Sequence, residues 1–152
     1  MMRFTIIFAA LILSVTFFIG CGGNSQNPHG TIHVEGTVTL DGAPIEGVNI
    51  TLAPREGDQA AGGITNDKGK FTVATSGFTG AKPGSYDVTF VKMELLPNLS
   101  FEESMEKYGG NPPEPKRIVP QKYENPKTSG IEPVTVETDR KKNVFTFELT
   151  SQ

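Results

Sequence analysis

Apolar and polar residues alternate along much of the chain, and this pattern predicts short β-strands. Between residues 31 and 40 the apolar side chains share one face, namely Ile32, Val34, Val38 and Leu40. A period of two places the remaining polar side chains on the opposite face, as in a half-buried strand. The same period returns at residues 48–52, 61–65, 71–73, 86–90, 134–136 and 145–149. Seven short strands separated by turns predict an all-β fold, a seven-stranded antiparallel sandwich.

Two turns of different composition separate pairs of these strands. Residues 66–69 read Asn-Asp-Lys-Gly, which are residue types that tolerate positive φ and bond their own backbone. We expect them to close a hairpin between the strands of Ile64 and Phe71, with Gly69 at positive φ. The charged run at residues 139–143 is predicted to be a second hairpin turn, joining the last two strands.

The alternation stops at Glu94, and a long, Pro-rich insertion extends from residue 94 to residue 130. Loops longer than about 15 residues are uncommon and often functional. Inside this insertion Ser100 and Glu103 have the spacing of a capping box, and Gly109 can end a helix. The short helix between them would carry its apolar residues on one face: Phe101, Met105 and Tyr108.

The insertion also contains the candidate binding residues. Its aromatic and basic side chains are of the kinds that bind glycans, anionic polymers or proteins from a loop. The candidates are Tyr108, Lys116, Arg117, Lys122 and Tyr123. The alternative is that the segment packs over an open sheet edge and protects it from aggregation. We favour that alternative for Pro120 and Tyr123.

Composition limits the classes of partner. The chain has 152 residues, which predicts one domain, and a net charge of −3. Proteins that bind nucleic acid carry clustered Lys and Arg, so a nucleic-acid partner is not expected. A polybasic membrane patch is not expected for the same reason.

The N-terminus has the plan of a secretory signal. Arg3 is followed by an uncharged run, residues 5–20. As a helix this run would span about 24 Å, which is short of the ~30 Å hydrocarbon core of a bilayer. Cys21 is the only cysteine, so no disulfide is expected.

Residues 18–21, Phe-Ile-Gly-Cys, resemble the bacterial lipobox. The resemblance implies a signal peptide of residues 1–20, cleavage between Gly20 and Cys21, and a covalent lipid on Cys21. The membrane would then be a partner through this anchor, with no other cofactor. Residues 21–30 are polar and Gly-rich and predict a flexible tether. Gly22 stands where an inner-membrane retention signal carries Asp, which implies the outer membrane.

The strands and turns of residues 31–152 resemble a known domain. Residues 34–38, 41–48, 65–71 and 83–88 together look like the carboxypeptidase regulatory-like domain. The tail, residues 118–149, is similar to small bacterial lipoproteins built on that domain. The resemblance implies a transthyretin-like (prealbumin-like) sandwich and a non-enzymatic binding or structural role at the cell envelope, with an unknown ligand. A glycan and an envelope protein are the partner candidates beside the membrane.

Enzyme and metal sites receive little support from the residues. His29 lies in the predicted tether and His33 faces outward beside Glu35, whereas a metal site needs further ligands nearby. Asn66 and Asp67 lack the later bidentate acid of a calcium loop. Two alternatives stay open: a carbohydrate-binding module using Tyr108 or Tyr123, and a small transthyretin-type hydrolase in which His33 would meet an arginine.

Overall fold

The computed structural model describes residues 30–57, 59–94, 99–111 and 113–152. The predicted signal peptide, the cleavage site at Gly20 and Cys21, and the tether up to residue 29 lie outside them.

Six strands form one sheet in the order β7-β6-β4-β3-β8-β9, and every pair in it is antiparallel. Its central strands β3 and β8 share the longest ladder, from Asn49↔Val91 to Pro54↔Tyr86. The bounds are β3 Asn49–Pro54, β4 Ala61–Ile64, β6 Ala74–Thr75, β7 Phe78–Thr79, β8 Gly84–Val91 and β9 Val134–Val136.

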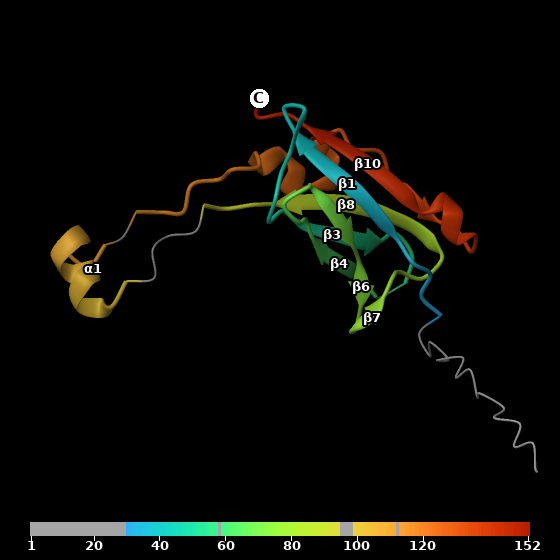
Figure 1. The fold of residues 1–152 in the computed structure, drawn as a ribbon, viewed down its shortest axis with the longest axis horizontal. Helices are drawn as coiled ribbons and strands as arrows, with labels where there is room; N and C mark the ends of the chain where they lie inside the picture. The colour runs from blue at the N-terminus through green and yellow to red at the C-terminus, as the bar shows by residue number, and fades with distance from the viewer. Residues whose placement is uncertain (1–29, 58, 95–98, 112) are drawn as a thin grey trace, which may run out of the picture.

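The second sheet is built around β1 (Figure 1). Its strands are β1 Glu35–Leu40, β2 Ala43–Pro44, β5 Lys70–Thr72 and β10 Val144–Leu149. β1 pairs antiparallel with β2 and β5 but parallel with β10 along its whole length. The prediction of a purely antiparallel sandwich is therefore wrong at this pair.

The charged run before β10 connects the two sheets. The predicted hairpin at residues 139–143 is wrong, because β9 belongs to the six-stranded sheet and β10 to the other. A 3₁₀ turn, η2 Arg140–Lys142, carries the chain between the sheets instead. β10 thereby arrives beside β1 in the same direction. A tight hairpin joins only antiparallel neighbours, whereas the parallel strands β1 and β10 are separated by most of the chain.

One hydrophobic core lies between the two sheets. Phe90 of β8 meets Phe147 of β10 edge to face at 5.0 Å between ring centroids, so the aromatic contact crosses from sheet to sheet. The predicted inward faces are confirmed at their centres: Val34, Val38, Val48, Ile50, Leu52, Phe71, Val73, Tyr86, Val88, Phe90, Val136, Phe147 and Leu149 are buried. The all-β prediction is confirmed for the described residues, in which three two-residue strands, β2, β6 and β7, accompany the seven predicted strands.

The turn at residues 66–69 is a corner between the sheets and not a hairpin. β4 before it pairs with β3 and β6, whereas β5 after it pairs with β1. The Oδ1 of Asn66 accepts bonds from the backbone nitrogens of Lys68 and Lys70, at 3.0 and 2.9 Å. Gly69 adopts φ +68°, as predicted. The sequence thus predicted the turn at these residues correctly, but it did not predict that the next strand pairs with β1 in the other sheet.

The predicted insertion divides into two parts at a bridge between Met93 and Arg117. We refer to residues 94–116 as the arm, and its described residues carry α1, Phe101–Tyr108. Residues after them return to the body through η1 Gln121–Glu124 and α2 Pro126–Ser129, which pack against β8. In the described part of the chain no helix has the length and apolar character needed to span a bilayer.

Candidate functional site

The five predicted binding residues do not converge on one site. Tyr108 lies on α1, and Lys116 is exposed on the irregular segment that leads from the arm back to the body. Arg117 forms an ion pair with Glu124 of η1. The Lys122 ammonium lies 5.0 Å from the centre of the Tyr123 ring. The five side chains therefore divide between the arm and the segment of residues 117–129.

Tyr123 is part of the core, being only 4% exposed. Its ring meets Phe90 edge to face at 6.5 Å, and its hydroxyl accepts a 2.9 Å bond from the backbone nitrogen of Thr150. Burial raises the pKa of the phenol, but the bonds to Thr150 and the charge of Lys122 outweigh burial and hold the pKa below its usual value. The Tyr123 ring is therefore packed in the core, and a binding role for this residue stays an untested prediction.

Tyr123→Phe should lower the free energy of unfolding by about 1 kcal/mol, because the backbone nitrogen of Thr150 loses its acceptor while the ring stays in the core. Urea unfolding of the variant and the wild type measures the difference. Tyr108→Phe is the matched control, since that ring lies on the arm and should change stability by less than about 0.5 kcal/mol. Equal effects of the two variants would contradict the assignment of Tyr123.

His33 is paired with a carboxylate. Its Nε2 lies 3.1 Å from Oε2 of Glu35, and its side chain is partly exposed. The hydrolase alternative requires an arginine at this place, and the contact found is acidic instead. Among the described residues, no three His, Cys, Asp or Glu side chains are grouped in a way that could hold a metal ion.

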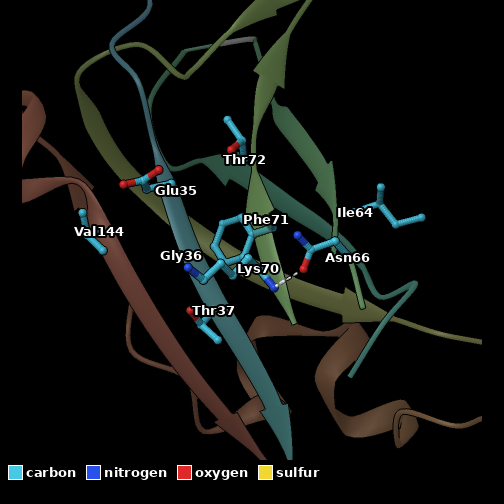
Figure 2. A pocket seen from close by; sticks show the side chains of 9 residues that line it. All are labelled: Glu35, Gly36, Thr37, Ile64, Asn66, Lys70, Phe71, Thr72 and Val144. Carbon is cyan, nitrogen blue, oxygen red and sulfur yellow. Dashed lines mark hydrogen bonds between the residues drawn. The ribbon is translucent and has the colours of Figure 1, made fainter. Parts of the chain in front are cut away.

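A shallow groove of about 570 Å³ lies over β1 and β5 (Figure 2). It is lined by Glu35, Gly36, Thr37, Ile64, Asn66, Lys70, Phe71, Thr72 and Val144. Two of its polar side chains already have partners within the protein: Asn66 accepts bonds in the corner turn, and Glu35 contacts His33. Figure 2 shows the bond from Lys70 to Asn66 along one wall. The groove offers its apolar rim, Ile64 and Val144, more readily than a polar ligand set.

Helix α1 is formed as its sequence predicts. The Ser100 hydroxyl accepts from the backbone nitrogen of Glu103, whose carboxylate accepts from the Ser100 nitrogen at 2.8 Å. Gly109 ends the helix in the left-handed conformation. The hydrogen bonds from Ser100 hold the pKa of Glu103 below its ordinary value. The ionised carboxylate therefore stabilises the helix at neutral pH, and this stabilisation is lost as the pH falls through the lowered pKa of Glu103.

The apolar face of α1 does not pack on the sandwich. None of its residues is buried; Phe101 is 79% exposed and Met105 46%. The sequence predicted this helix and its apolar face, but it did not predict that the apolar side chains would be exposed. An apolar helix face normally supplies the core contacts that stabilise a helix. Here that face stays exposed, and Phe101 is the most exposed large apolar side chain of the described residues.

The arm leaves the body at the end opposite the chain entrance. Ile32 bridges Ala81, just before β8 begins, and Met93 bridges Arg117, just after β8 ends. Eight residues of β-strand separate the two points by about 25 Å. Figure 1 shows the first described residues, in blue, at one end of the sandwich and α1 beyond the other.

Comparison of the chain with family models, with curated proteins and with solved structures found no match. The candidate site therefore stands on the geometry of the arm.

Proposed function

We propose that this protein is a non-enzymatic, lipid-anchored binding module of the bacterial envelope, in which a transthyretin-like sandwich holds an exposed helix away from the membrane. One observation carries the proposal: the chain enters at one end of β8, and the α1 arm leaves at the other. The sandwich is then a spacer between an anchor and a presented surface.

The anchor end is supported by sequence. Cys21 follows an uncharged run and a lipobox-like segment, and it precedes Gly30 by nine residues. Such a connection reaches at most about 30 Å when fully extended. Several acyl chains hold a protein on a bilayer stably, whereas a single chain holds it only marginally. Lipid on Cys21 would keep the Ile32 end of the sandwich near the membrane and direct the arm away from it.

The binding role is supported by the state of α1. A two-turn helix with an outward apolar face gains little from the body of the protein that carries it. Two caps nevertheless hold it in helical form. The base of the arm is held by the 2.7 Å bond from the Glu94 nitrogen to the Lys116 oxygen and by the ion pair of Arg117 with Glu124. A helix that is held in shape and left exposed in this way is suited to binding another molecule through its apolar face.

Cys21→Ala should abolish incorporation of an alkyne-tagged fatty acid and move the protein from the membrane fraction to the soluble fraction. The measurement is in-gel fluorescence of the labelled protein, with immunoblotting of both fractions. Ser25→Ala, which changes the same segment without removing the thiol, is the control and should label as the wild type does. Undiminished labelling of Cys21→Ala would show that the anchor is not on this residue.

A further inference from the structure

We infer that α1 docks, through Phe101 and Met105, into an apolar groove with a basic rim on a partner protein. The position of that partner, on the side away from the membrane, rests on the proposed function. The chemistry of the partner does not, because it follows from α1 alone.

The shape of the surface favours a groove. Phe101 and Met105 are four residues apart, so they lie one turn apart on the same face of the helix. Helices with such a pair commonly bind by laying the apolar face into a hydrophobic groove. The aromatic anchor and the flexible thioether are both residue types enriched at the centres of protein interfaces.

The helix is also prepared for binding. Isolated helices shorter than about 12 residues are marginal in water, and α1 has eight residues. The capping box at Ser100 and the left-handed Gly109 compensate in part. A partner groove would bury the apolar face and supply the packing that the sandwich does not. Because the helix is preformed, less ordering free energy is spent at docking.

Charge selects the chemistry of the partner. Three acids, Glu102, Glu103 and Glu106, lie on α1 beside one base, Lys107. An acidic helix is repelled by an anionic lipid surface and by a second copy of itself. Lys and Arg around an apolar groove would complement it and would steer association. We therefore commit to a protein with a basic rim.

Photocrosslinking in cells with the full-length chain tests the inference. p-Benzoylphenylalanine is placed at Phe101 or, as a matched control, at Phe78, the other exposed phenylalanine of the described chain. The expected result is a discrete adduct with a different protein from position 101 and none from position 78. The same adduct should fall at least about fivefold when Glu102→Lys and Glu106→Lys are combined. No adduct, an adduct with lipid, glycan or a second copy, or insensitivity to the charge reversal overturns the inference.

Binding of the crosslinked protein to the purified full-length chain completes the test. Phe101→Ala should weaken binding about 30-fold, as expected for an aromatic anchor. Its melting temperature should stay that of the wild type, because the ring is exposed. Unchanged affinity, or a partner whose binding surface has no apolar groove with Lys or Arg at its rim, overturns the inference. Cys21→Ala separates the two proposals: it should bind the partner in solution with unchanged affinity, even if the anchor is elsewhere.

Discussion

Gly69→Ala is expected to lower the free energy of unfolding by about 3 kcal/mol, by combining left-handed strain with a steric clash. Gly69 has φ +68°, a left-handed conformation in which any residue with a Cβ is strained. A Cβ at this position would also press against the carbonyl oxygen of Val38 and lie 3.3 Å from the backbone nitrogen of Ile45. Both atoms are held in place, because the Ile45 nitrogen donates to the Val38 oxygen at 3.4 Å and the Val38 nitrogen donates to the Gly69 oxygen at 2.8 Å. Urea unfolding monitored by circular dichroism measures the loss.

Gly77→Ala is the control that separates strain from space. Gly77 has φ +84°, but a Cβ there would meet no atom within 4 Å. It should therefore cost only the conformational part, about 1 kcal/mol. Equal losses for the two variants would mean that the tight contact of the corner with β1 contributes nothing. The melting temperatures of both variants, followed without any ligand, provide an independent reading.

The strands were predictable because their signal is local. A period of two in Val34–Val38 or in Tyr86–Phe90 states which side chains face the core, whatever strand lies alongside. Pairing partners were not predictable in the same way. β4 and β5 are joined by four-residue turn chemistry typical of a hairpin, yet they lie in different sheets. The turn at residues 66–69 is held against β1 by the bond from the Val38 nitrogen to the Gly69 oxygen, and β1 is distant in sequence.

The candidate site shows the same division. Ser100, Glu103 and Gly109 specify α1 within ten residues, so the helix could be predicted. Whether its apolar face would meet the sandwich depends on the path of the arm, which the residues of the helix do not encode. Tyr123 illustrates the converse, because an aromatic residue in a Pro-rich loop became part of the core through Phe90.

Asn143 was predicted as a turn residue, but it is fully buried, and it joins the crossover to both neighbouring segments. Its Oδ1 accepts from the backbone nitrogen of Glu137 at 2.8 Å. Its Nδ2 donates to the Glu137 oxygen at 2.8 Å and to the His33 oxygen at 3.4 Å. The side chain thus satisfies the backbone where the chain leaves β9 and where it approaches β1. It links the segment that follows β9 to the segment that precedes β1.

Asn143→Ala is expected to lower the free energy of unfolding by about 3 kcal/mol, since it removes a fully buried side chain and leaves the partly buried backbone groups of Glu137 without their partners. Asn125→Ala is the matched control: that exposed side chain caps α2 by accepting from the Lys127 nitrogen, and its loss should cost about 1 kcal/mol. Hydrogen exchange gives a second measurement, because the Glu137 amide should lose protection in the Asn143 variant and retain it in the other. If that amide stays protected, the bridge between the sheets is held by the backbone of η2, and the buried amide side chain is not what fixes the parallel position of β10.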